Sequence, residues 1–190
     1  MTAQPTDSVR GAILAAAVGV VERAGTSDVT VDDVAAAAGV DASIVTGMFG
    51  AVDELLIEAA LGLAADDLRL DAIVLASGAP TVSAYAHHFA KRRVFYRAMR
   101  SGPVTAKLDA RMAVMVAPLI LVQIRALVGP NITDELVASM AAETTVEAFE
   151  ITNGWMLESS DSDGPETLYV LFEALVLHRL DIARSLSTGA

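Results

Sequence analysis

The segment from Val31 to Met48 constrains the fold of this chain more than any other stretch. Ala35 supplies the small contact that two short helices need when they cross steeply, and Gly39 tolerates the positive φ of a tight turn. On both sides of the turn, apolar residues occupy the positions expected to pack between the two helices: Val34, Ala38, Val40, Val45 and Met48. The segment therefore predicts a helix-turn-helix, with an accidental hairpin of alanine-rich helices as the alternative interpretation.

Helical periodicity continues on both sides of this segment. A first helix is expected to end at Gly25, Thr30 with Asp33 resembles a capping box, and a fourth helix opens near Asp53. After a break at Leu75 to Pro80, the pattern predicts one long helix from Thr81 that carries Tyr85, Phe89, Tyr96 and Met99, then helices from Lys107 to Val128, from Thr133 through Trp155, and after Pro165. No alternating strand pattern of useful length appears.

These patterns predict an all-α chain of about nine helices. Residues 1–50 are expected to form a three-helix, helix-turn-helix module, with a connecting helix to about residue 68. Residues 69–190 are expected to form a larger helical domain. A chain of 190 residues can bury the core that each part needs.

Composition excludes several other classes of protein. The longest charge-free stretch, between Arg111 and Arg125, contains Pro118 and Gln123 and falls short of the roughly 20 apolar residues of a membrane span. Gly11 to Val21 lacks the preceding basic cluster of a signal peptide, and we expect no membrane association. The absence of cysteine excludes disulfides and cysteine-ligated zinc, and we expect a cytoplasmic protein.

No catalytic or metal-binding pattern is present in the sequence. Neighbouring His87 and His88 diverge by about 100° on a helix and cannot chelate one metal together. A nucleophile elbow, a phosphate-binding glycine loop and paired acids backed by histidine are all missing. We therefore expect neither an enzyme nor a bound cofactor or metal.

The N-terminal segment, Ile13 to Leu56, resembles the tetracycline-repressor (TetR) family of bacterial regulators. Family-like positions are Gly25, Thr30, Val34, Ala35, Gly39, Val40, Phe49 and Leu55. The segment from His88 to Gly102 and the region of Trp155 are similar to the second domain of that family. The resemblance implies that the third helix enters the major groove of operator DNA, that the larger domain binds a small ligand, and that the last two helices form a homodimer.

The sequence departs from the family pattern in its charge. Residues 1–60 contain two basic and nine acidic residues, and the whole chain carries a formal charge of −11, which repels nucleic acid at long range. Val52 stands where a lysine commonly meets phosphate in the family. The residues expected to contact DNA are therefore uncharged or acidic: Thr30, Asp41, Ala42, Ser43, Thr46 and Gly47. The alternative is a protein of the same fold that binds a ligand or a protein partner and has lost DNA binding.

In the larger domain, apolar and aromatic residues could line a cavity for a small apolar or aromatic ligand, with ordinary core packing as the alternative. These are Tyr85, His88, Phe89, Phe95, Tyr96, Met112, Met115, Phe149 and Trp155. Arg93, Arg97 and Arg100 share one helical face, which could bind an anion, pair with the acidic N-terminal module, or be solvated.

A homodimer interface is expected on the helices that begin after Thr133 and Pro165. Both helices have apolar residues on more than one side, and a surplus apolar face indicates a partner. The predicted interface residues are Val137, Met140, Val146, Leu171, Leu175 and Leu186. A two-fold dimer would place two recognition helices about one DNA turn, roughly 34 Å, apart. The sequence thus predicts a ligand-responsive, DNA-binding regulator, acting as a repressor.

Overall fold

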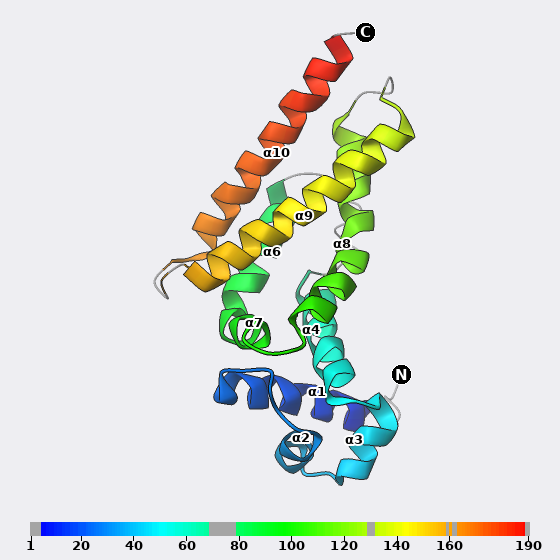
Figure 1. Cartoon of the computed structure of the whole chain (residues 1–190), viewed down its shortest axis with the longest axis vertical. Helices are drawn as coiled ribbons and strands as arrows, with labels where there is room; N and C mark the ends of the chain where they lie inside the picture. Colours follow the sequence, from blue (N-terminus) through cyan, green and yellow to red (C-terminus); the bar gives the residue numbers. More distant parts are fainter. Residues whose placement is uncertain (1–4, 69–78, 129–131, 159, 161–162, 189–190) are drawn as a thin grey trace. The chain divides into compact units, whose positions relative to one another are not determined.

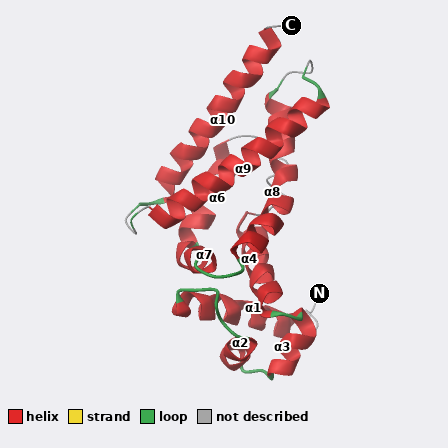
Figure 2. Ribbon diagram, viewed as in Figure 1, coloured by secondary structure: helices red, strands yellow, loops and turns green. Residues whose placement is uncertain are grey.

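The computed structural model describes residues 5–68, 79–128, 132–158, 160 and 163–188. Within these ranges the chain forms helices joined by short loops and contains no strand, which confirms the all-α prediction (Figure 2). None of the helices in the described ranges combines the length and the apolar character that crossing a bilayer requires.

The chain divides into two compact units, and each is described by itself. The first unit comprises Met1–Ala64 and Arg92–Asp109, and the second comprises Ala65–Lys91 and Ala110–Ala190. The domain boundary predicted near residue 69 stays a prediction, because residues 69–78 lie outside the described part of the chain. The units show that a later segment, Arg92–Asp109, packs with the N-terminal helices.

The first unit is built from α1 (Pro5–Ala24), α2 (Val31–Ala38), α3 (Ala42–Phe49), the greater part of α4 (Val52–Leu68) and α7 (Arg93–Arg100) (Figure 1). Helix α1 packs against both α2 and α7, and α2 packs against α3. The largest fully buried side chains of the first unit come from all of these elements and from the start of α8 (Thr105–Leu127): Ile13, Val21, Val34, Val45, Leu55, Leu56, Ile57, Phe95, Met99 and Leu108. One apolar core therefore holds the helix-turn-helix and α7 together.

The single long helix predicted from Thr81 is wrong. The structure has α6 (Ala79–Lys91) and α7 in its place, with Arg92 between them at φ −107° and ψ 17°, outside the helical region. No glycine or proline marks this break in the sequence. Burial of Phe95, Tyr96 and Met99 in the first unit accounts for it, because tertiary packing outweighs helix propensity.

The second unit contains α6, most of α8 (Thr105–Leu127), α9 (Asp134–Glu158) and α10 (Pro165–Thr188). Helix α10 packs against α6 and α9. The predicted cap at Thr133 is present, since the Leu136 N–H donates to Thr133 Oγ1 at 3.3 Å. Of the break predicted at Leu75 to Pro80, residues 75–78 lie outside the described residues, and α6 begins at Ala79.

Helix α9 satisfies its buried hydroxyl groups internally. Thr144, Thr145 and Thr152 each donate to the carbonyl oxygen one turn earlier, at 2.6, 2.7 and 2.7 Å. Such bonds remove the cost of burying a hydroxyl group without a partner. These three polar positions therefore allow α9 to pack on its neighbours along much of its length.

An arginine joins α10 to α9. The Arg179 guanidinium donates to Glu143 Oε2 at 3.1 Å and lies 2.6 Å from Glu147 Oε1, and its side chain is only 10% exposed. The two carboxylates lie about one turn apart on α9, so a single arginine meets both. These two ion pairs link α10 to α9.

Candidate nucleic-acid interface

The turn between α2 and α3 has the geometry predicted at Gly39. Gly39 adopts φ 68° and ψ 33°, the left-handed conformation that glycine adopts without steric cost. The Val40 N–H donates to the Ala35 carbonyl at 3.1 Å and closes the end of α2. The chain then turns sharply enough for α3 to pack back on α2.

Two acidic residues hold the beginnings of α2 and α3. Thr30 and Asp33 form the predicted capping box: the Asp33 N–H donates to Thr30 Oγ1 at 3.1 Å, and the Thr30 N–H donates to Asp33 Oδ2 at 2.9 Å. Asp41 caps α3 by accepting from the Ser43 N–H at 2.8 Å. Side-chain and backbone hydrogen bonds from Thr30 lower the pKa of Asp33, and those from Ser43 lower the pKa of Asp41.

Helix α3 has one buried and one exposed face. Val45 and Phe49 are 1% and 8% exposed and hold α3 to the core. Ser43, Thr46 and Gly47 are exposed, and Ile44 is 41% exposed although it is apolar. The predicted segment from Asp41 to Met48 thus forms the cap and most of a separate short helix, Ala42–Phe49, whose outer face is exposed as a recognition helix requires.

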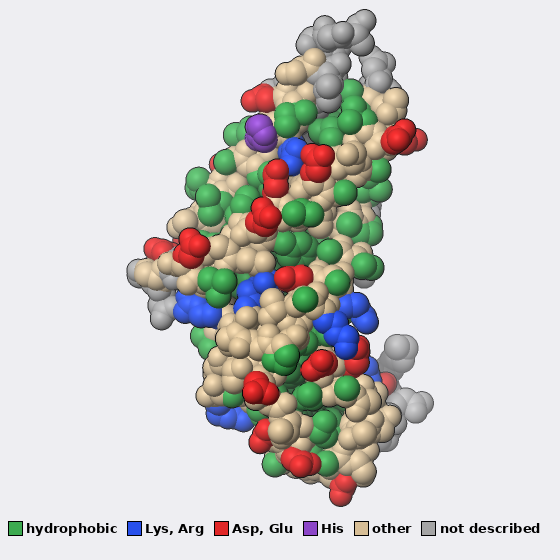
Figure 3. Space-filling view, viewed as in Figure 1, with side chains coloured by type: hydrophobic (Ala, Val, Ile, Leu, Met, Phe, Trp, Pro, Cys, Tyr) green, Lys and Arg blue, Asp and Glu red, His purple; other side chains and the backbone are tan. Residues whose placement is uncertain are grey.

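The basic residues of the module are few, and Arg10 is already engaged. Its guanidinium forms an ion pair with Glu58 and lies over the Phe49 ring, 4.6 Å from the centroid. The other base of residues 1–60 is Arg23, at the end of α1. Acidic side chains are spread over the visible surface of α1 to α3 (Figure 3).

The segment that contains α2, α3 and the turn between them matches a known protein family. The family model described as "Bacterial regulatory proteins, tetR family" matches residues 13–60. This match identifies the N-terminal segment as a TetR-type domain. The match runs from the middle of α1 to the first half of α4 and includes α2, the turn and α3. Comparison with curated proteins gives no match.

The TetR family consists of DNA-binding transcription regulators. The predicted DNA-contact residues differ in their exposure and in the contacts they make. Thr30 and Asp41 are exposed but act as caps, and the Thr30 hydroxyl donates to Asp33 at 2.6 Å. Ala42 is half-buried, while Ser43, Thr46 and Gly47 are exposed on α3. Their contact with DNA stays a prediction.

Ile44 is a further exposed residue of α3 and was not among the predicted DNA-contact residues. Its apolar side chain is 41% exposed. Helical geometry could have indicated this, because Val45 and Phe49 share a face that Ile44, about 100° away from Val45, does not share.

The predicted ligand residues are divided between the two units. Phe95 and Tyr96 belong to the first unit, where their rings pack edge to face and the Tyr96 hydroxyl donates to the Ala60 carbonyl at 3.2 Å. Their burial there matches the core-packing alternative. The remaining candidates, Tyr85, His88, Phe89, Met112, Met115, Phe149 and Trp155, belong to the second unit.

Tyr85, His88 and Phe89 form a connected group on α6. The Tyr85 ring lies 4.6 Å from Phe89 and 4.9 Å from Phe172 of α10, and its hydroxyl is 3.3 Å from Thr152 Oγ1 of α9. Phe172 and Thr152 were not among the predicted residues. Tyr85 therefore joins three helices of the second unit through its ring and its hydroxyl.

His88 is buried beside the carboxylate of Asp67, which also contacts Lys91. Its Nδ1 lies 3.1 Å from Asp67 Oδ2, and the Lys91 ammonium lies 2.8 Å from Asp67 Oδ1. The imidazole is fully buried, while Asp67 is 18% exposed.

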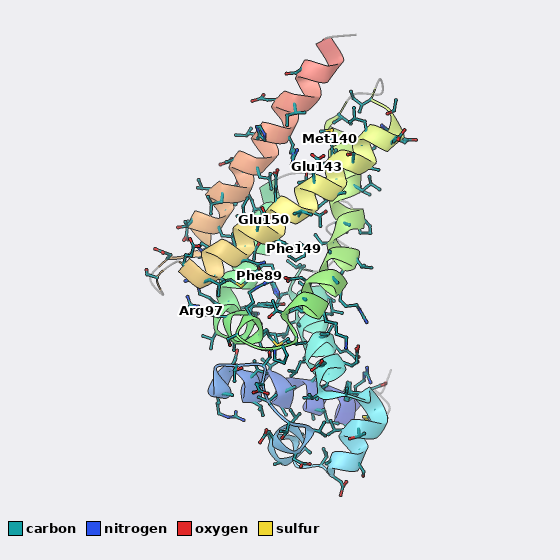
Figure 4. All side chains as sticks on the ribbon, viewed as in Figure 1. Phe89, Arg97, Met140, Glu143, Phe149 and Glu150 are labelled. Carbon is teal, nitrogen blue, oxygen red and sulfur yellow. The ribbon has the colours of Figure 1, made fainter. Side chains whose placement is uncertain are left out.

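In Figure 4, Phe89 is drawn on α6, and Phe149 and Glu150 on α9. A ligand site formed by this group stays a prediction.

Exposure divides the predicted dimer residues into two sets. Val137, Met140 and Leu175 are buried against their own chain, the first two in a cluster with Ile124 and Ile132. Val146 and Leu171 are 58% and 41% exposed on α9 and α10. The side chain of Leu186 lies outside the described residues, so Val146 and Leu171 are the positions from which the interface prediction can be argued further.

Of the arginines predicted to share a face, Arg100 has its partner within the first unit. Its Nη2 lies 2.5 Å from Asp109 Oδ1. In the same unit the Lys107 ammonium lies 2.8 Å from Glu54 Oε1, so the segment that carries α7 pairs with the acidic module through α4.

Proposed function

We propose that the chain is a homodimeric, ligand-responsive transcription regulator that acts as a repressor in the cytoplasm by binding operator DNA through α3. The observation that carries this proposal is the outer surface of α3, held by Gly39 and Asp41 within the segment that matches the TetR family. An eight-residue helix of this kind fits the major groove of B-form DNA.

The charge of the module sets the expected character of binding. The logarithm of the binding constant falls linearly with the logarithm of the salt concentration, and the slope is about −0.9 for each phosphate neutralised. Two basic residues in residues 1–60, one of them paired with Glu58, supply few such contacts. We therefore expect weak binding to random DNA and a shallow salt dependence for operator binding.

Fluorescence polarisation tests this proposal. Duplexes that flank the protein's own gene are titrated with the full chain at low salt, with a random duplex of equal length as the control. Ser43→Glu should abolish specific binding because it adds an anion to the exposed face of α3. Val94→Glu adds the same charge at a site 60% exposed on α7 and should leave binding unchanged.

The acidic surface favours a second candidate function. In this alternative the chain keeps the TetR fold as a ligand-binding or protein-interaction dimer and no longer binds DNA. It is supported by the carboxylates of Asp33 and Asp41, which already occupy the N-terminal ends of α2 and α3, where phosphate would otherwise bind. A folded protein that binds no flanking duplex even at low salt would favour this alternative.

The proposed ligand is a small apolar or aromatic molecule bound by the group around Tyr85 and Phe89. It would change DNA binding only through different affinities for two spacings of the DNA-binding modules. Trp155 is the single tryptophan of the chain and is 4% exposed within the same unit, so its fluorescence reports on this region. Quenching by an aromatic compound that Tyr85→Ala removes, and Tyr85→Phe preserves, would support the site.

A further inference from the structure

The exposed face of α3 has an unusual chemical composition. Successive residues of an α-helix are about 100° apart, so Thr46, Ser43, Gly47 and Ile44 follow one another, in that order, around the outer face. All four are exposed, and the buried Val45 and Phe49 occupy the opposite face. A DNA groove that receives α3 meets these four residues first.

Most ways of recognising a base are missing from this face. Guanine is usually bound by arginine or lysine, adenine by asparagine or glutamine, and cytosine by an acidic side chain. Residues 42–49 contain none of these residue types. The carboxylate that precedes them, Asp41, accepts from the Ser43 N–H at the helix end.

What remains on the face suits thymine. The 5-methyl group of thymine projects into the major groove and is recognised by apolar contact, including contact with a threonine methyl. Ile44 presents an apolar side chain that is 41% exposed, and the exposed Thr46 presents a methyl group beside its hydroxyl. Contact with thymine methyl groups would remove the exposed apolar surface of Ile44 from water, which is favourable.

Gly47 lies between these groups. A Cβ atom built at Gly47 meets no atom within 4 Å, so no neighbour in the described part of the chain explains the glycine. A bare backbone at the centre of the face lets the helix approach the floor of a groove closely. Thr46 and Ile44 then stand on either side of the closest approach.

We propose that α3 recognises thymine methyl groups through Ile44 and the methyl of Thr46, so that the operator has A·T pairs where α3 enters the groove. This proposal rests on the proposed function and names the base class that it requires. Ser43 and Thr46 hydroxyls complete the contact as donors or acceptors, without the bidentate selection of guanine or adenine.

The test uses the full chain and a duplex selected from a random library at low salt. Thymines in the selected half-site are then replaced one at a time by uracil, which removes the methyl group and keeps base pairing. Loss of one buried methyl contact should weaken binding about fourfold. Replacement of thymines outside the half-site should have no effect.

Matched variants assign the contacts to their residues. Thr46→Ser removes the methyl and keeps the hydroxyl, so it should weaken binding and abolish the uracil effect at one position. Thr46→Val keeps the methyl and should preserve that effect, while Ile44→Ala should abolish it at another position. Circular dichroism confirms that each exposed substitution leaves the fold intact.

The outcomes separate this inference from the function on which it rests. Failure to select any duplex, with folded protein, overturns both. Specific binding that is equally strong with thymine and uracil throughout the half-site overturns the recognition of thymine methyl groups and leaves DNA binding in place.

Discussion

At the scale of single residues, Gly47 is the position where local stability and the proposed contact disagree. Glycine inside a helix costs about 1 kcal/mol relative to alanine, and α3 is short. The space around Gly47 would accept a methyl group without a clash. Packing in the described structure therefore does not require this glycine, whereas a close approach to a partner does.

Gly47→Ala should stabilise the protein by about 1 kcal/mol and weaken operator binding. Thermal unfolding and polarisation measure the two effects on the same sample. Gly62→Ala is the control, because Gly62 lies within α4 and its added Cβ also meets no atom within 4 Å. Equal DNA affinity for wild type and Gly47→Ala would contradict the close approach at this residue.

Gly102 presents the opposite case, a glycine that packing requires. A Cβ at this position would overlap Ser27 Oγ and lie 3.2 Å from the Ser27 backbone nitrogen. Ser27 is 3% exposed and its hydroxyl donates to the Met99 carbonyl at 3.3 Å. The loop after α1 therefore sits directly on the turn after α7.

Gly102→Ala should destabilise the protein by about 1–3 kcal/mol, the usual cost of overpacking. Ser27→Gly combined with Gly102→Ala should recover part of this loss, because it removes the overlapping side-chain atoms. Denaturant unfolding of the two single variants and the double variant gives the interaction energy. Additive losses would show that the two residues do not meet.

At the scale of elements, the sequence predicted those helix ends that depend on local chemistry. Gly39 and the Thr30–Asp33 box lie where the pattern placed them, because caps and turns involve residues a few positions apart. The break at Arg92 was not predicted, since its cause is the packing of α7 against α1, far away in the sequence. Among the site residues, Ile44 was missed because apolar character alone does not show which face of a helix is buried.

The caps also predict an acid dependence for α2 and α3. Since the pKa values of Asp33 and Asp41 are lowered in the folded state, the unfolded chain binds more protons in acid. The stabilisation is present above the ordinary aspartate pKa and is lost as pH falls through the lowered folded values. The free energy of unfolding should therefore decrease with falling pH in this acidic window.

Asp33→Asn and Asp41→Asn should each reduce this dependence, measured as the slope of unfolding free energy against pH. Asp32→Asn is the control, because it removes the same charge from the first turn of α2 and leaves both capping contacts in place. A slope that is unchanged in both capping variants would show that other carboxylates determine how the free energy of unfolding depends on pH in acid.

At the scale of the whole molecule, the second unit has large exposed apolar side chains on α8, α9 and α10. Val146 and Leu171 lie on α9 and α10, which pack against each other, and Val114 of α8 is 74% exposed. The proposed two-fold dimer uses α9 and α10. A two-fold interface contains each residue twice, so one substitution introduces two charges into it.

Val146→Lys and Leu171→Glu, made separately, should therefore convert the proposed dimer into folded monomers, as measured by sedimentation velocity. Val114→Lys adds a charge to α8 and should remain dimeric, which makes it the matched control. Because the proposed operator binding uses two modules held about 34 Å apart, the monomeric variants should lose binding to the full site while keeping their helical content. If Val114→Lys gives monomers and the other two variants stay dimeric, the interface lies on α8, and the spacing of the modules must be set by that helix.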